Sequence, residues 1–227
     1  MVLTVILAEA ALELVPSEIG GHPAIRAQAK ALGRKPGQLL LDRNHHPGVD
    51  KLDGGERRGR PDITQATLLN LLEHPLAKTG RLEVAVHTRD GDLIRIRPDT
   101  RLPRGEARFQ GLLAKVLREG ASNDKEPWLW LERDQSPKQV LAAVAAGPVV
   151  RLDEGGQALT AADLAAKAEG DGGDLTVVIG GYPTGDFSRA WKEAAPETVS
   201  LWPQPLAAWV IAAEVAAGYH ATLQPAG

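Results

Sequence analysis

A run of arginines near the middle of the chain opens a segment with helical spacing. Within about 40° of one direction around this helix lie four cations and a glycine: Arg104, Arg108, Gly111, Lys115 and Arg118. The opposite side is apolar at i, i+3, i+4, i+7 and i+8 spacing: Phe109, Leu112, Leu113, Val116 and Leu117. Such a cationic ridge suits a chain of phosphates; an ordinary solvated helix face is the alternative.

Positive charge is concentrated in the same part of the chain. Residues 51–118 carry 14 Lys and Arg against 9 Asp and Glu, a net charge of +5, while the rest of the chain carries −8. A protein whose overall charge is −3 therefore has a local positive surface. Nucleic acid is the partner that this distribution favours.

A second candidate site is the tripeptide Arg60-Pro61-Asp62. The proline fixes the backbone between two charged side chains at the start of an expected helix. Asp62 could cap that helix, pair with Arg60, or orient a group of a substrate.

Two turns rich in glycine or proline follow buried strands near the C-terminus. Residues 180–185 read Gly-Gly-Tyr-Pro-Thr-Gly, which is neither the GxGxxG of a dinucleotide-binding fold nor a phosphate-binding P-loop. Their glycines would expose backbone amides and carbonyls to a flat ligand, or simply form a tight turn at a sheet edge. Residues 201–206 form a rigid turn with two prolines before an alanine-rich helix.

Other reactive sites find little support in the sequence. The chain has no cysteine, which excludes disulfides, thiolate nucleophiles, and iron–sulfur or cysteine-bound zinc sites. His45 and His46 are adjacent and would point to opposite faces of a strand, so they predict no metal site. No serine lies in a GxSxG motif.

Short apolar runs alternate with helical patterns along the chain. Strands are predicted at residues 2–7, 38–42, 82–87, 93–97, 149–152, 175–179 and 199–201. Helices are predicted at residues 23–32, 64–73, 105–119, 137–145, 161–168 and 206–219, with Asp62 or Thr64 as the N-cap of the second. This alternation predicts one α/β domain, residues 1–227, with a largely parallel central sheet.

An insertion is expected within that domain. Asp90-Gly91 between two β-rich segments predicts a hairpin, so residues 75–130 would add a hairpin and the basic helix. The apolar run at residues 2–7 is too short to span a membrane and no basic region precedes it, so we expect a buried strand and not a signal peptide. With the absence of cysteine, this predicts a cytoplasmic protein without a membrane partner.

The order of these motifs resembles the nucleolar essential protein 1 family, the pseudouridine N1-methyltransferases of small-subunit ribosomal RNA within the SPOUT (α/β-knot) superfamily. The resemblance covers nearly the whole chain. It rests on residues 6–16, Leu-Asp-Arg-Asn-His-His at 41–46, Arg-Pro-Asp-Ile at 60–63, His-Thr at 87–88, Thr-Arg-Leu-Pro-Arg at 100–104, Arg-Phe at 108–109, Ile-Gly-Gly-Tyr-Pro at 179–183 and residues 201–206. The chain departs from the family pattern where Gln65 replaces a typical His, and where Pro47 and Gly48 replace a bulky residue and Lys.

This resemblance implies a homodimer with a deep trefoil knot towards the C-terminus. S-adenosylmethionine would sit bent in a knotted pocket. The implied cofactor-binding residues come from the two turns: Gly180, Gly181, Gly185, Leu201, Trp202, Pro203, Gln204, Pro205 and Leu206. Because true knots are rare, this topology follows from the family alone.

The resemblance also implies a site for small-subunit ribosomal RNA. A flipped-out pseudouridine would present N1 to the methyl group, while Arg101, Arg104 and Arg108 hold phosphates. Arg60 and Asp62 would face the RNA at the catalytic centre. An ordinary carboxyl pKa of about 3.9 makes Asp62 a poor base for a weakly acidic imide, so orienting the base and Arg60 is favoured over proton removal.

Two other functions stay open at this point. One is a non-catalytic RNA-binding factor in ribosome assembly, which uses the same basic ridge. The other is a SPOUT methyltransferase that acts on transfer RNA. Other ribosome-assembly proteins are possible partners under each of these readings.

Overall fold

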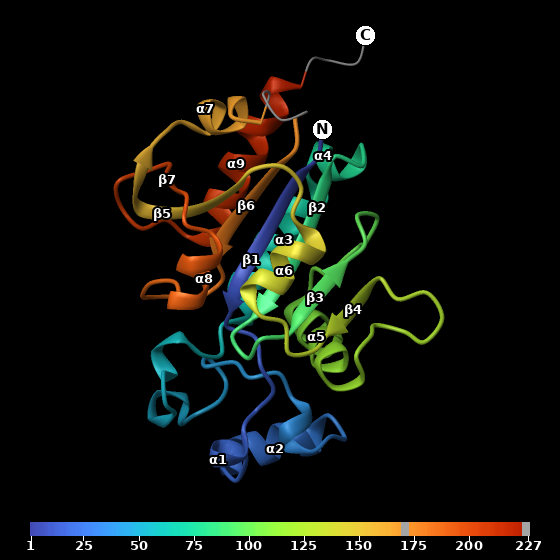
Figure 1. Ribbon diagram of the computed structural model, residues 1–227. Helices are drawn as coiled ribbons and strands as arrows, with labels where there is room; N and C mark the ends of the chain where they lie inside the picture. Colours follow the sequence, from blue (N-terminus) through green and yellow to red (C-terminus); the bar gives the residue numbers. More distant parts are fainter. Residues whose placement is uncertain (169–172, 224–227) are drawn as a thin grey trace.

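The computed structural model describes residues 1–168 and 173–223, in which seven strands form one sheet of order β4-β3-β2-β1-β6-β5-β7 (Figure 1). The strands are β1 (Leu3–Ala10), β2 (Leu82–Thr88), β3 (Leu93–Ile96), β4 (Leu129–Glu132), β5 (Val149–Ala158), β6 (Leu175–Gly180) and β7 (Thr198–Ser200). Strands β2, β1, β6, β5 and β7 run parallel, whereas β3 and β4 are each antiparallel to their neighbours. The predicted α/β class, largely parallel sheet and β2–β3 hairpin are confirmed.

Helices cover both faces of this sheet. They are α1 (Ser17–Gly20), α2 (Pro23–Ala31), α3 (Pro61–Glu73), α4 (Pro75–Lys78), α5 (Glu106–Glu119), α6 (Pro137–Val144), α7 (Ala161–Ala166), α8 (Arg189–Ala194) and α9 (Ala208–Thr222). Helices α3, α4, α5, α7 and α9 pack into the main core on one face, and α6 and α8 pack on the other (Figure 1).

The central strand β1 has an apolar run at residues 5–8 because both of its faces are buried. Leu3, Val5 and Leu7 of β1 point into the main core, while Ile6 and Ala8 point into the core under α6 and α8. A parallel strand buried on both faces needs apolar side chains at every position instead of alternating ones.

The segment between β1 and α3 has a small core of its own. It holds α1, α2 and three short 3₁₀ turns, and it extends beyond the carboxyl end of β1, at the bottom of Figure 1. Its buried apolar residues are Val15, Ile19, Ile25, Ala29, Leu39, Leu41, Val49 and Leu52.

The predicted strand at residues 38–42 is wrong. Pro36–Gln38 form a 3₁₀ turn, and Leu40 makes only an isolated bridge to Leu14. The leucines that suggested a strand are instead buried in the cores on either side, and a short buried run has no period that separates strand from irregular chain. Strand β4 is not predicted from the sequence, because four residues are too few to show the alternation of apolar and polar side chains that is typical of a strand.

The predicted start of α3 is also wrong. The helix begins at Pro61, so Arg60 occupies the N-cap and its side chain makes no capping hydrogen bond. Proline suits the first helical position because its φ is already helical and its missing N–H is not needed there. Asp62 and Thr64 therefore lie inside the first turn, and the capping role for Asp62 is ruled out.

In the described residues, no helix combines the length and hydrophobicity that a membrane crossing needs. The single domain of residues 1–227, the status of residues 75–130 as an insertion and the cytoplasmic location stay predictions.

Candidate active site

A cavity of about 400 Å³ opens where β5, β6 and β7 end. In a parallel sheet, the carboxyl ends of the strands are where loops converge to form a ligand site. Seven of the nine residues predicted to bind cofactor line it: Gly180, Gly185, Leu201, Trp202, Gln204, Pro205 and Leu206. The two turns that the sequence singled out therefore face one another across a single cavity.

Gly181 and Pro203 do not line this cavity. Gly181 instead hydrogen-bonds to the backbone at the end of β1. Its N–H donates to the Ala8 carbonyl at 2.7 Å, and its carbonyl accepts from the Ala11 N–H at 2.9 Å. A Cβ at this position would lie 2.8 Å from Ala10 Cα. The glycine is explained by this close approach of two backbones.

The cavity combines an apolar lining with carboxylates. Its apolar side chains include Leu152, Ile179, Val199 and Ile211, and its acidic ones are Asp153, Glu154 and Asp186. Such a site suits a ligand with a flat apolar part and a positive charge. Sequence reasoning missed all three acids, since they lie outside the two turns.

Arg60 lines the same cavity and forms a two-pronged ion pair with Asp62. Its Nε donates to Asp62 Oδ1 at 2.8 Å and its Nη2 donates to Oδ2 at 2.7 Å. These hydrogen bonds raise the pKa of Arg60, which keeps the guanidinium charged. Of the three roles considered for Asp62, pairing with Arg60 is the one observed.

The three predicted RNA-binding arginines in the first turn of α5 and the loop before it are open to solvent. Arg104 is 82% exposed, and among the described residues its one ion pair is a long one of 3.8 Å to Glu73. Arg101 and Arg108 are exposed, and their side chains make no hydrogen bond or ion pair with any described residue. All three therefore have charge available for an anionic ligand.

The second half of the predicted ridge is different. Lys115 donates to the Ser122 carbonyl at 3.0 Å and pairs with Glu119, and Arg118 pairs with Glu119 as well. Arg118 is only 23% exposed. The ridge of free cations is thus limited to the first turn of α5 and the loop before it.

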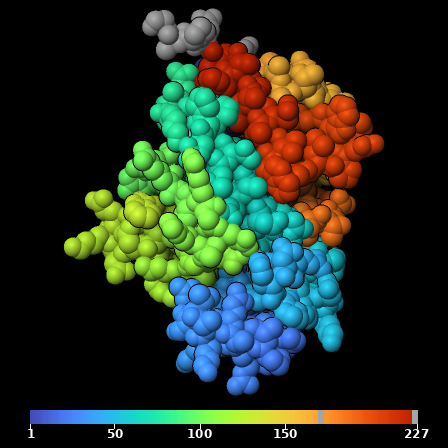
Figure 2. All heavy atoms as spheres, turned by 180° about the vertical axis from the view of Figure 1, so that it is seen from behind, coloured from blue at the N-terminus to red at the C-terminus, as the bar shows by residue number. Residues whose placement is uncertain are grey.

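Gln65 joins that loop to α3. Its side-chain amide donates to the carbonyls of Pro103 at 3.4 Å and Arg104 at 3.1 Å. This bond holds the arginine-bearing loop beside the helix that starts with Arg60 and Asp62, and the two segments adjoin in Figure 2. The Gln that departs from the family pattern therefore has a structural role, which its position in the motif did not indicate.

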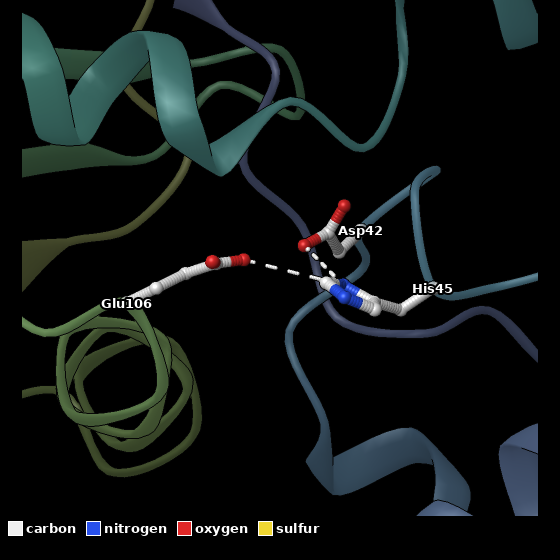
Figure 3. A group of neighbouring side chains, drawn as sticks. All are labelled: Asp42, His45 and Glu106. Carbon is white, nitrogen blue, oxygen red and sulfur yellow. Dashed lines mark hydrogen bonds and ion pairs between the residues drawn. The ribbon is translucent and has the colours of Figure 1, made fainter.

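A cluster of Asp42, His45 and Glu106 connects α5 to the loop after residue 41 (Figure 3). His45 Nδ1 lies 3.0 Å from Asp42 Oδ2 and 4.0 Å from Glu106 Oε1. The amide of Gln110 donates to Asp42 Oδ2 at 2.7 Å and to Glu106 at 3.0 Å. N–H donors hydrogen-bond to these oxygens, so the cluster forms a hydrogen-bonded latch between α5 and this loop.

This latch predicts a pH-dependent contribution to stability. The hydrogen bond to Asp42 raises the pKa of His45, and a group whose pKa is raised on folding stabilises the fold below its unfolded pKa and loses that effect as the pH rises through the folded value. We expect His45→Gln to lower the free energy of unfolding by about 0.2–1 kcal/mol at pH 6 and by nothing measurable at pH 8. Urea unfolding of the variant and the wild type at both pH values tests this, and an equal loss at both would contradict it.

Three comparisons place the chain among known proteins. The EMG1/NEP1 methyltransferase family model matches residues 5–220. The ribosomal RNA small subunit methyltransferase Nep1 of Thermococcus kodakarensis is 38% identical over 230 residues, covering 97% of this chain and 99% of the relative. Its counterpart from Methanothrix thermoacetophila is 32% identical over 219 residues, covering 96% and 95%.

A solved structure agrees with these sequence matches. Archaeoglobus fulgidus Nep1 bound to S-adenosylhomocysteine superposes with a TM-score of 0.85 at 32% identity, covering 97% of this chain and 98% of that one. The matched region contains the cavity and the arginine-bearing segments alike.

Proposed function

The chain belongs to the EMG1/NEP1 methyltransferase family, and from that premise we propose that it transfers the methyl group of S-adenosylmethionine to N1 of a pseudouridine in small-subunit ribosomal RNA. The observation that carries the proposal is the position of Arg60. Its side chain lines the cavity and is held by Asp62 in the first turn of α3. Gln65 of the same helix bonds the loop that carries Arg101 and Arg104. One residue thus belongs to both the cofactor side and the RNA side of the molecule.

The residues of the cavity fit the cofactor. S-adenosylmethionine supplies, when bound, an electrophilic methyl group on a positively charged sulfonium. Leu152, Val199 and Ile211 offer an apolar surface to adenine, and the carboxylates of Asp153, Glu154 and Asp186 favour the positive charges. Gly180 and Gly185 line the same cavity and add no side chain of their own to it.

On the RNA side, Arg101, Arg104 and Arg108 would hold phosphates and fix the register of the substrate. The flipped base would enter towards Arg60, whose planar guanidinium offers N–H donors to its carbonyl oxygens. Asp62 is 43% exposed and uses both oxygens to hold Arg60. We therefore assign Asp62 to orientation, with most of the rate coming from placing N1 in line with the methyl group.

We also propose the homodimer and the C-terminal knot. The buried side of α9 packs within the chain, while its outer side adds Val210 to an exposed apolar group with Trp202 and Leu206. Trp202 and Leu206, which are 57% and 38% exposed, line the cavity, and Val210 on α9 is 39% exposed. These exposed apolar side chains offer a surface for a second copy.

The arginines predict a specific salt dependence. Arg104→Ala and Arg108→Ala are each expected to weaken RNA binding and to lower the slope of log K against log salt by about 0.7–0.9, the share of one phosphate. Arg118→Ala serves as the matched control because its charge is already paired with Glu119. Fluorescence anisotropy of an RNA hairpin at several salt concentrations measures the slope. An unchanged slope in both variants would show that this loop does not bind RNA phosphates.

The RNA class can be tested with natural RNA. Small-subunit ribosomal RNA and transfer RNA would be isolated from cells that lack this protein and incubated with it and labelled S-adenosylmethionine. Label in the small-subunit RNA alone supports the proposal. Label in transfer RNA would favour a methyltransferase that acts on transfer RNA. Binding of RNA without transfer of the methyl group would favour a non-catalytic assembly factor.

A further inference from the structure

A charged clamp formed by Glu9, Arg57 and Tyr182 lies on the outer side of the cavity wall. Arg57 lies over the ring of Tyr182, with Cζ 3.9 Å from the ring centroid. Its Nη1 donates to the Asp186 carbonyl at 2.7 Å and its Nη2 donates to Glu9 Oε2 at 3.2 Å. One guanidinium thus makes three contacts, two of them with the chain that forms the wall.

Glu9 completes the clamp from the end of β1. Its carboxylate also accepts the backbone N–H of Ser188, at 3.3 Å and 3.2 Å to the two oxygens, and it is only 15% exposed. Its φ of 52° is one of two positive values at non-glycine positions among the described residues. A backbone in this sparsely populated region persists only where surrounding contacts hold it.

The clamped loop is part of the cavity. Tyr182, Asp186 and Phe187 all line it, and the Tyr182 ring packs edge-on against Phe187 with centroids 5.7 Å apart. Burial raises the pKa of the Tyr182 hydroxyl, so a neutral ring faces the guanidinium. The position of this ring, and with it the width of the cavity beside Gly180, depends on Arg57.

The clamp also connects the wall to the catalytic arginine. Arg57 ends a short turn, the next residue Arg58 is anchored by Glu13 in the interior, and Arg60 follows at the cavity. Both ends of the stretch from Arg57 to Arg60 are therefore held by side-chain contacts, Arg57 to the outer side of the cavity wall and Arg60 to Asp62.

We propose that Arg57 is a positioning residue for cofactor binding, which holds the Tyr182–Asp186 wall from outside through its stacking on Tyr182, its bond to the Asp186 carbonyl and its pair with Glu9. This inference rests on the proposed use of the cavity for S-adenosylmethionine. Arg57 itself makes no contact with the reacting atoms.

The test compares Arg57→Ala, Arg57→Lys and Arg189→Ala. Arg189 is a matched control because it is 92% exposed in the adjoining helix α8 and, within the described part of the chain, its side chain pairs with Glu193 alone. S-adenosylhomocysteine affinity is measured by calorimetry. We expect Kd to rise about thirtyfold in Arg57→Ala, about tenfold in Arg57→Lys, which keeps the charge but loses the planar stacking, and to stay within about twofold in Arg189→Ala.

Steady-state kinetics separate positioning from general damage. The KM for S-adenosylmethionine should rise in parallel with Kd while kcat at saturating cofactor stays within about threefold of the wild type. Unchanged affinity in a folded Arg57→Ala protein, or unchanged affinity in Arg57→Lys if the alanine variant does not fold, would overturn the inference. Wild-type protein that binds no S-adenosylhomocysteine would instead defeat the proposed function itself.

Discussion

Methyl transfer is expected to slow by about a hundredfold when Asp62 is replaced by asparagine, because Arg60 would lose the partner that aligns its guanidinium at the cavity. An asparagine can accept one of the two hydrogen bonds but carries no charge, and its NH₂ group would face the guanidinium. The loss should lie in kcat, with the affinity for S-adenosylhomocysteine within about threefold of the wild type.

The chain contains a matched control for this substitution. Arg97 and Asp99 form the same two-pronged pair at the same spacing, with distances of 2.9 Å and 2.7 Å, but Asp99 is 68% exposed and neither residue lines the cavity. Asp99→Asn should leave kcat unchanged. Equal rates for Asp62→Asn and the wild type would show that the Arg60–Asp62 pair plays no part in transfer.

The pH profile separates the two catalytic roles considered for Asp62. If the carboxylate only orients Arg60, the deficit of Asp62→Asn is the same at every pH at which the protein is folded. If it removed the N1 proton, a higher pH would restore part of the rate, since solvent base would take over that step. A rate deficit that disappears with rising pH would therefore contradict the orienting role.

The second large effect concerns two neighbouring glycines. A Cβ at Gly180 would lie 2.9 Å from Cζ of the Tyr182 ring, which is held between Arg57 and Phe187. Gly180→Val is therefore expected to displace the ring and weaken S-adenosylhomocysteine binding by about a hundredfold. RNA binding at the first turn of α5 should persist, because those residues lie on other elements.

Gly181→Ala should give the opposite result. Its Cβ would meet the backbone at Ala10 Cα, which cannot rotate away, so we expect a loss of about 1–3 kcal/mol in the free energy of unfolding. Calorimetric titration and urea unfolding of both variants measure the contrast. A Gly181→Ala protein with normal stability but no affinity for S-adenosylhomocysteine would show that Gly181 acts in cofactor binding. That result would contradict its assignment to backbone packing.

Much of the fold could be predicted because its elements carry strong local patterns. The buried strand β6, the amphipathic α5 and the hairpin at Asp90-Gly91 each follow from hydrophobic period or turn chemistry. The order of strands in the sheet does not follow from these patterns, since β6 inserts between β1 and β5 through contacts distant in sequence. The family resemblance is confirmed by the match over residues 5–220, but it was not used to predict the order of the strands.

The candidate site was predictable where motifs are local and not where it depends on tertiary contacts. The turns at residues 180–185 and 201–206 were predicted to bind the cofactor, and residues of both turns line one cavity. The acid at Asp153 and the clamp of Glu9 and Arg57 lie far from those turns in sequence. The neutralisation of Arg118 by Glu119 likewise depends on side-chain geometry that helical spacing does not reveal.

The most direct test of the proposed reaction uses two matched RNA hairpins that differ only in carrying pseudouridine or uridine at one position. The protein is incubated with labelled S-adenosylmethionine and each hairpin, and nucleoside mass spectrometry locates the methyl group. We predict methylation at N1 of the pseudouridine and none in the uridine hairpin. Methylation at another atom, or no transfer to a pseudouridine hairpin that the protein binds, would contradict the proposed activity.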